Sequence, residues 1–290
     1  MTHGSIGGHG VLTEEKIKEF LREDIGYGDI TSAALLEDGQ QARARIIFRE
    51  EGVTAGLEEA ASIFAALGCT VKLLEDNGSR VTSGTIVMEI GGQAKALLAG
   101  ERTALNLLGR MSGIATAVAA ADSKASKANP SVRVAATRKT APGLRDLDKR
   151  AVELGGGDTH RLRLDDCVLI KDNHLSLELS VGEAVARARR RVSFTKKIEV
   201  EVRSLEQAVE AAETGADIIM FDNMPPSEIS RCLNALNGRG LREGRLFEAS
   251  GGITMENVEE YAATGVDILS MGCLTHSVSS LNVKLELEPA

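Results

Sequence analysis

The second half of the chain alternates short apolar runs with amphipathic segments. Six of the apolar runs are interpreted as strands, at 132–137, 167–170, 198–202, 217–221, 245–249 and 266–271. Between them, segments such as 204–215 and 254–265 open on Ser or Thr and close on Gly, as helices do. Continuous apolar strands that alternate with helices predict a parallel sheet covered by those helices.

Such a sheet can be an open doubly wound sheet or a (β/α) barrel. No GxGxxG follows the first predicted strand, as a dinucleotide-binding doubly wound sheet would favour. Polar residues instead follow nearly every strand, which is typical of the carboxyl-terminal mouth of a barrel. We therefore predict an open or incomplete (β/α) barrel over residues 117–275, because fewer than eight strands can be recognised.

The first half has a different pattern, with strand-like runs punctuated by Gly, Asn and Ser around a helical segment at 57–68. A long helical pattern begins at Lys95, and a break is expected near Gly113. Residues 13–116 are predicted to form an α+β sandwich domain, preceded by a flexible N-terminus at 1–12. The end of the chain, 276–290, alternates like a strand and is expected to return to this first domain. The predicted fold class is therefore α/β, with an N-terminal α+β sandwich domain and a C-terminal open or incomplete (β/α) barrel.

Composition narrows the function classes. The 290 residues include 43% hydrophobic and 26% charged residues, as in ordinary soluble domains. A formal net charge of −8, with 3% aromatic residues and no Trp, argues against nucleic acid as the main partner. No uninterrupted apolar run approaches the roughly 18 residues of a membrane span, so no membrane association is expected.

The four cysteines are far apart and show no metal-binding spacing; they are Cys69, Cys167, Cys232 and Cys273. We expect neither a zinc site nor a disulfide framework, and each cysteine is interpreted as a small buried apolar residue. A reducing cytoplasm fits this usage best.

Cationic residues gather at the ends of the early strands of the predicted barrel. They are Arg138, Lys139, His160, Arg161 and Lys171. Each alone would be an ordinary surface charge, but five at one mouth of an acidic protein predict a substrate with several negative charges. Gly155, Gly156 and Gly157 are expected to form a mobile loop that carries His160 and Arg161.

Acidic residues occupy the later strands. Glu199 and Glu201 are two positions apart on a strand, so both are expected to face the barrel interior, near Asp222 at the end of the next strand. Inward carboxylates are costly unless they meet cations. They could hold Mg²⁺ through water, bind ribose hydroxyls or stabilise a cationic transition state; salt bridges to neighbouring lysines are the structural alternative.

Glycine-rich turns follow the last two strands, at Ser250, Gly251 and Gly252 and at Gly272. Such turns let backbone N–H groups approach a phosphate, although an ordinary turn has the same composition. His276 lies close enough to Gly272 in the sequence to reach the same anion.

Eight segments, taken in order, resemble the motifs of the quinolinate phosphoribosyltransferase family. They are "EDIGYGDITS", "GERTALNLLGRMSGIAT", "TRKTAPGLR", "GGGDTHRLRLDDCVLIKDNH", "IEVEV", "FDNM", "EASGGIT" and "GVDILSMGCLTHS", within residues 13 to 287. The resemblance implies an α/β sandwich and an open barrel in each subunit of a cytoplasmic homodimer or larger homo-oligomer.

The resemblance also implies a role for each site residue. A pyridine dicarboxylate, quinolinate, would be bound by Thr137, Arg138, His160, Arg161 and the neighbouring subunit's copy of Arg102. Phosphoribosyl diphosphate would be bound by Lys139, Lys171, Glu201, Asp222, Ser250, Gly251, Gly252, Gly272 and His276. Of these, Lys139, Lys171, Glu201 and Asp222 would be catalytic, and Glu201 and Asp222 would hold Mg²⁺, directly or through water.

The implied reaction joins the two substrates and gives nicotinate mononucleotide, diphosphate and CO₂. Two departures from the family pattern stand beside the site residues: Ala136 replaces a frequent Asp, and Thr159, Leu162 and Arg163 flank His160 and Arg161 where the family commonly has Asn-His-Arg-x-Gly. Three alternatives stay open: a related molybdenum-associated pyrophosphorylase-like protein, a Schiff-base lyase using Lys139 or Lys171, and a non-enzymatic anion-binding barrel.

Overall fold

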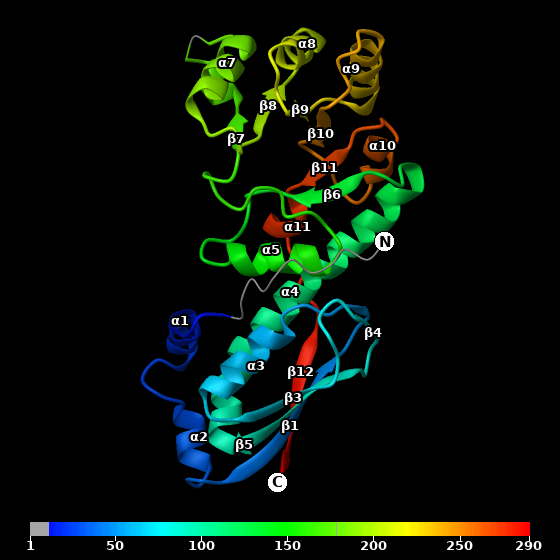
Figure 1. The fold of residues 1–290 in the computed structure, drawn as a ribbon. Coiled ribbons are helices and arrows are strands. Elements are labelled where there is room, and N and C mark those ends of the chain that lie inside the picture. The colour runs from blue at the N-terminus through cyan, green and yellow to red at the C-terminus, as the bar shows by residue number, and fades with distance from the viewer. Residues whose placement is uncertain (1–11, 178) are drawn as a thin grey trace. The chain divides into compact units, whose positions relative to one another are not determined.

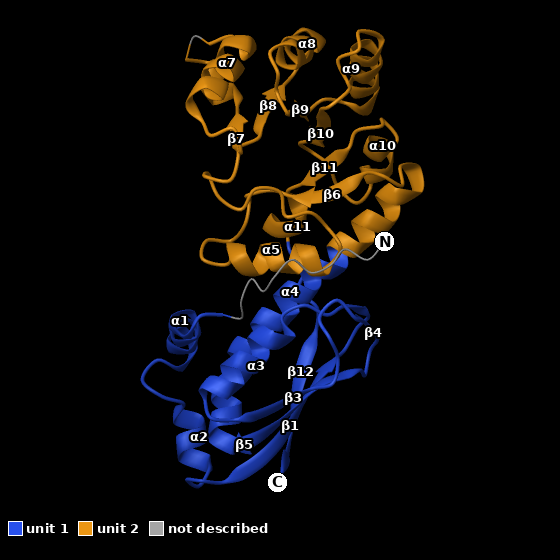
Figure 2. Ribbon diagram, viewed as in Figure 1, with its two compact units in different colours: residues 1–117, 278–290 blue, residues 118–277 orange. Residues whose placement is uncertain are grey.

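The computed structural model describes residues 12–177 and 179–290 and divides the chain into two compact units (Figures 1 and 2). Unit 1 comprises Met1–Ala117 and Val278–Ala290, and unit 2 comprises Val118–Ser277. The expected flexible N-terminus, apart from residue 12, lies outside the described residues.

Unit 1 is built on a four-stranded sheet in the order β12-β1-β5-β3. The bounds are β1 Gln41–Phe48, β3 Thr70–Leu73, β5 Ile86–Gln93 and β12 Val283–Pro289. Buried and exposed residues alternate along most of β1, so one face of the sheet belongs to the core. Helix α3 (Leu57–Ala66) contacts β3 and β5. The remaining elements of this unit are α1 (Glu14–Ile25), α2 (Ile30–Leu35), β2 (Gly52–Val53) and β4 (Arg80–Val81).

The C-terminal strand does return to the first sheet, as its alternation predicts. β12 pairs antiparallel with β1 from Ala42 opposite Pro289 to Phe48 opposite Val283. Residues from the two ends of the chain therefore complete one sheet.

The predicted break in the long helix is wrong. Helix α4 runs without interruption from Ala94 to Ala128, and Gly113 lies inside it. A Cβ atom at Gly113 would lie 2.1 Å from the carbonyl oxygen of Ser279, and one at Gly109 would lie 2.8 Å from that of Leu281. These glycines let the chain before β12 lie directly against the helix, so they serve close packing and do not end the helix.

By length and composition α4 could span a membrane, although no uninterrupted apolar run of the sequence predicts such a span. However, 67% of its most apolar window is buried inside the protein. This burial is typical of a core helix, in which apolar residues face other side chains.

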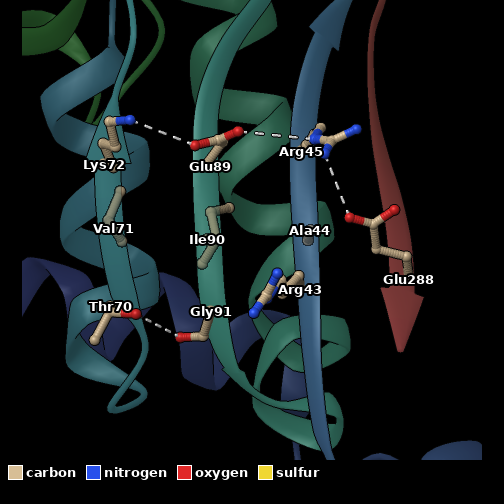
Figure 3. A pocket seen from close by; sticks show the side chains of 10 residues that line it. All are labelled: Arg43, Ala44, Arg45, Thr70, Val71, Lys72, Glu89, Ile90, Gly91 and Glu288. Atoms are coloured by element: carbon tan, nitrogen blue, oxygen red, sulfur yellow. Dashed lines mark hydrogen bonds and ion pairs between the residues drawn. The ribbon is translucent and has the colours of Figure 1, made fainter. Parts of the chain in front are cut away.

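The other face of the unit 1 sheet carries charged residues around a shallow depression (Figure 3). Glu89 lies 3.7 Å from Lys72 and 3.8 Å from Arg45, which also lies 3.4 Å from Glu288. Exposed pairs of this kind contribute little stability each. They are consistent with a solvated sheet face.

Unit 2 contains a six-stranded parallel sheet in the order β6-β11-β10-β9-β8-β7. All six predicted strands are confirmed: β6 Arg133–Ala136, β7 Val168–Ile170, β8 Ile198–Val202, β9 Ile218–Asp222, β10 Leu246–Ser250 and β11 Ile268–Met271. The helices between them are α5 Arg145–Leu154, α6 Asp172–Leu175, α7 Val181–Arg191, α8 Leu205–Glu213, α9 Pro226–Gly238, α10 Val258–Ala262 and α11 Cys273–His276.

This strand order is that of a barrel opened between β6 and β7. Consecutive strands are neighbours from β7 to β11, and β11 then pairs with β6, but within the described residues β6 has no pairing with β7. A single bridge between Ala135 and Asp158 lies at the open side of β6. The backbone N–H of Asp158 donates to Val134 at 2.8 Å, and that of Ala136 donates to Asp158 at 3.0 Å. The prediction of an open (β/α) barrel is confirmed.

The packing of Gly113 leads to a first test. Gly113→Ala should reduce the free energy of unfolding by about 1 to 3 kcal/mol, because the added methyl group meets a backbone oxygen. Gly238→Ala is the matched control, since nothing lies within 4 Å of a Cβ atom at the end of α9. Urea unfolding of both variants measures the difference, and equal stability of the two would contradict this role for Gly113.

Candidate active site

The carboxyl ends of the unit 2 strands surround a cavity of about 440 Å³. Eleven of the predicted site residues line it: Thr137, Arg138, Lys139, His160, Arg161, Lys171, Glu201, Asp222, Ser250, Gly251 and Gly252. The lining also includes Leu169, Met220, Asn223, Glu248 and Ser270, which were not predicted. One mouth of the open barrel therefore collects both the cations and the acids.

Three glycines position the segment that carries His160 and Arg161. Gly155 caps the end of α5, and Gly156 has a φ of +90°. A Cβ atom at Gly157 would lie 2.7 Å from a Val118 methyl group. His160 itself has a φ of +52°, and its N–H donates to the Asp158 carboxylate at 2.7 Å. Gly156 thus supplies a left-handed turn, Gly157 packs closely beside β6, and a side chain–backbone hydrogen bond supports His160 in its left-handed conformation.

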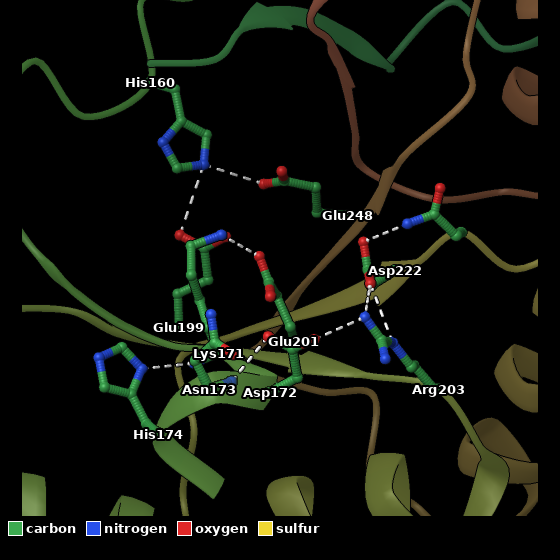
Figure 4. A network of polar contacts seen from close by, with 11 residues as sticks. His160, Lys171, Asp172, Asn173, His174, Glu199, Glu201, Arg203, Asp222 and Glu248 are labelled. Carbon is green, nitrogen blue, oxygen red and sulfur yellow. Dashed lines mark hydrogen bonds and ion pairs between the residues drawn. The ribbon is translucent and has the colours of Figure 1, made fainter. Parts of the chain in front are cut away.

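Each acid that faces the cavity on β8 and β9 has a basic partner. Lys171, directly after β7, forms an ion pair with Glu201 of β8. Arg203 binds Asp222 of β9, with Nη2 at 2.8 Å and Nε at 3.0 Å (Figure 4). The same Arg203 Nη2 lies 2.9 Å from Asp172, so this unpredicted guanidinium joins two carboxylates. His174 accepts from the N–H of Lys171 at 2.9 Å and thereby caps α6.

At the wall of the cavity, His160 meets two fully buried carboxylates (Figure 4). Its Nε2 lies 3.1 Å from Glu248 and 3.4 Å from Glu199. The alternation of β8 turns Glu199 inward as predicted, but its partner is a histidine where a lysine was the expected alternative.

 Both glutamates come from strand positions whose side chains point into the barrel, and the histidine reaches them from the open side of the sheet.

Opposing influences act on the pKa values of His160 and Glu199. Burial alone lowers the pKa of His160, but the carboxylates of Glu199 and Glu248 outweigh it and raise that pKa to about 10. Against this, His160 Nδ1 accepts from the N–H of Arg161 at 2.7 Å, which requires Nδ1 without a proton. We therefore assign the ring as the Nε2–H tautomer. Burial raises the pKa of Glu199, whereas the hydrogen bond with His160 acts in the opposite direction.

The glycine turns meet the same mouth. Gly251 and Gly252 have φ values of +95° and +64°, and a Cβ atom at Gly251 would lie 2.3 Å from the Asn223 side chain. Asn223 in turn donates to Asp222 at 2.8 Å. Gly251 therefore requires glycine for conformation and for space, and Gly252 for conformation.

Gly272 and His276 do not line the cavity, although both were predicted to bind phosphate. They lie next to it: a Cβ atom at Gly272 would be 3.2 Å from the Lys139 side chain and 3.1 Å from the His276 ring. Thr275 also donates to the carbonyl oxygen of Lys139 at 2.8 Å. The segment after β11 thus packs against Lys139.

Two groups of residues have donors suited to a metal ion. Glu201 and Asp222 offer carboxylate oxygens to the cavity, and such oxygens together with substrate phosphates suit Mg²⁺. The second group is His160, Glu199 and Glu248, whose donor atoms lie within 4.8 Å of one another. A proton on Nε2 already accounts for the contacts of the second group, so the first fits a magnesium ion better.

Arg102 is exposed on α4 and belongs to unit 1. Its predicted contact with a neighbouring subunit remains a prediction.

Glu248 was not predicted as a site residue, although a signal was present: it lies two residues before Ser250 on β10, so the period of a strand turns it inward like Glu199.

The cysteines fit a structural interpretation. All four are free, Cys69 and Cys232 are buried, and burial raises the pKa of each of the four thiols. A raised pKa disfavours the reactive thiolate.

Comparisons with known proteins agree with this geometry. Residues 29–112 match the model of the quinolinate phosphoribosyl transferase N-terminal domain, and residues 114–286 match that of its C-terminal domain. The chain belongs to the quinolinate phosphoribosyl transferase family.

Named relatives are similar over nearly their whole length. The "probable nicotinate-nucleotide pyrophosphorylase (carboxylating)" of Methanothermobacter thermautotrophicus is 47% identical over 93% of this chain and 97% of its own. The carboxylating nicotinate-nucleotide pyrophosphorylase of Homo sapiens is 39% identical, over 93% and 90% respectively. The crystal structure of NadC from Streptococcus pyogenes has a TM-score of 0.89 at 38% identity, covering 96% of each chain.

Proposed function

We propose that this chain transfers a phosphoribosyl group from phosphoribosyl diphosphate to quinolinate and releases CO₂ and diphosphate. The observation that carries the proposal is one cavity in which Arg138, Lys139, Arg161 and Lys171 lie with Glu201 and Asp222. Its cations suit two polyanionic substrates, and its acids suit the sugar between them. Membership of the family supports this assignment.

Quinolinate has two neighbouring carboxylates, and the planar forks of Arg138 and Arg161 match that chemistry. Thr137 and His160 lie beside them in the cavity lining. A neighbouring subunit's copy of Arg102 would complete the site, so the working form would be a homodimer or a larger homo-oligomer.

Phosphoribosyl diphosphate would occupy the other part of the cavity. Lys139 and Lys171 would bind its phosphates, and the turn at Ser250, Gly251 and Gly252 would present backbone N–H groups. Gly272 and His276, which pack beside Lys139, would support the same region.

The reaction depends on the positioning of the two substrates and on electrostatic stabilisation of the charge that develops between them. As the bond from ribose C1′ to diphosphate breaks, positive charge develops on the sugar, and Glu201 and Asp222 offset it. The pyridine nitrogen of quinolinate then attacks C1′. The resulting pyridinium stabilises negative charge on the adjacent carbon, so the carboxylate there leaves as CO₂ and that carbon takes up a proton from water. Held in one cavity, the two substrates react without a covalent enzyme intermediate.

Magnesium is the cofactor that we propose, held by Glu201 and Asp222 directly or through water. When bound, it would neutralise charge on the departing diphosphate. Lys171 and Arg203 pair with these two carboxylates in the protein alone, and would then be free to turn toward phosphate.

Two of the alternatives are weakened by contacts in the site. A Schiff base requires a free lysine amine, whereas the amine of Lys171 is engaged in an ion pair with Glu201. A simple anion-binding barrel would be weakened by Glu201 and Asp222 in the same cavity. The free cysteines suit the reducing cytoplasm that we propose as the location.

The proposal is tested by measuring CO₂ released from quinolinate. Release should require both phosphoribosyl diphosphate and Mg²⁺, and chelation of the metal should abolish it. Asp222→Asn should lower kcat by about 100-fold, because it removes charge stabilisation in the transition state. Arg190→Met, at an exposed position of α7, is the control. Release without phosphoribosyl diphosphate would reject the transferase assignment.

A second test concerns the shared site. Arg102→Ala should abolish most activity, and so should Lys171→Ala. If Arg102 acts in the neighbouring subunit, mixed oligomers of the two inactive variants contain some intact sites and regain activity. Native mass spectrometry should establish that mixed oligomers form. Confirmed mixed oligomers without recovered activity would contradict the contribution of Arg102 across subunits.

A further inference from the structure

Helix α5 places two basic residues four positions apart, Arg145 and Lys149, on the side that faces the segments leading into the cavity. Neither residue lines the cavity itself. We propose that this pair, the α5 clamp, positions Arg138 and Arg161 so that both can bind the dicarboxylate substrate. The inference rests on the proposed function and adds positioning residues to it.

Lys149 holds the two segments just before the arginines. Its side chain is 1% exposed, and its ammonium donates to the carbonyl oxygen of Thr159 and, at 3.4 Å, to that of Ala136. Ala136 ends β6 two residues before Arg138, and Thr159 precedes Arg161 by two residues. One ammonium group thus ties together the two segments at the open side of the barrel, next to the single bridge between Ala135 and Asp158.

Arg145 holds the same segments from the other side of the arginines. Its Nη2 donates to the carbonyl oxygen of Arg138 at 3.5 Å, and its Nη1 donates to that of Leu162 at 3.4 Å. Its Nε donates to the Thr140 hydroxyl at 3.1 Å. Together the two residues of the clamp contact the backbone on both sides of Arg161, and the backbone before and at Arg138.

The clamp works against repulsion between like charges. Burial and then the nearby Arg161 and Arg145 lower the pKa of Arg138. Burial, followed by Arg145, lowers the pKa of Lys149 from 10.5 to about 8, although Asp158 acts in the opposite direction. Backbone carbonyl oxygens are the acceptors that offset this cost. An anionic ligand bound among the four cations, Arg138, Arg145, Lys149 and Arg161, would therefore offset their mutual repulsion.

Steady-state kinetics of Lys149→Met, Arg145→Gln and Arg145→Lys test the clamp. The first two should lower kcat/KM for quinolinate by about 10- to 100-fold, since small displacements of binding groups have effects of this size. The KM for phosphoribosyl diphosphate should change less than that for quinolinate, since among the groups proposed to bind it the clamp reaches only the segment around Lys139. Arg145→Lys should keep more activity than Arg145→Gln, because it retains a donor.

Arg190→Met again controls for the loss of one cation. Thermal unfolding identifies variants that fail to fold, and if Lys149→Met is one of them, the two Arg145 variants decide. Folded variants with a wild-type KM for quinolinate, or with equal losses for both substrates, would overturn the clamp. Failure of the wild-type protein to consume quinolinate would instead reject the proposed function.

Discussion

The site depends on holding like charges close together. Arg138, Lys139, Arg161 and Lys171 line one cavity, where their mutual repulsion would spread flexible side chains into solvent. A carboxylate and backbone hydrogen bonds hold these side chains in place against the repulsion. Glu201 pairs with Lys171, and the carbonyl oxygens of the segments around Arg138 and Arg161 accept from α5. The charges that remain uncompensated are then available to an anionic ligand.

The open side of the barrel makes this arrangement possible. A closed barrel would pair β6 with β7, whereas here a single bridge from Ala135 to Asp158 takes that place. The chain can therefore turn back at His160, in a left-handed conformation, and bring Arg161 into the mouth. The buried carboxylates of Glu199 and Glu248 fix the imidazole of His160. In this way an incomplete sheet gains a cavity-lining arginine where a strand would otherwise lie.

Much of the fold and of the candidate site could be predicted from the local sequence pattern. The ends of parallel strands share one edge, so Arg138, Lys171 and Asp222 could be placed together from their positions alone. Residues that act through tertiary contacts could not: Lys149 and Arg203 look like ordinary helix and loop charges in the sequence. Gly113 was misjudged for the same reason, because the backbone of Ser279 that packs on it is distant in the chain. Local sequence carries no information about such a partner.

The central claim is that the cavity binds paired carboxylates. Phthalate and benzoate differ by one carboxylate, and neither can be phosphoribosylated at a ring nitrogen. Thermal unfolding in equal concentrations of each measures their binding, since a ligand at 100 times its Kd adds about 2.7 kcal/mol to stability. We predict that phthalate raises the Tm of the wild-type protein, that benzoate does so far less, and that Arg161→Ala removes the difference. Equal stabilisation by both acids would contradict the account.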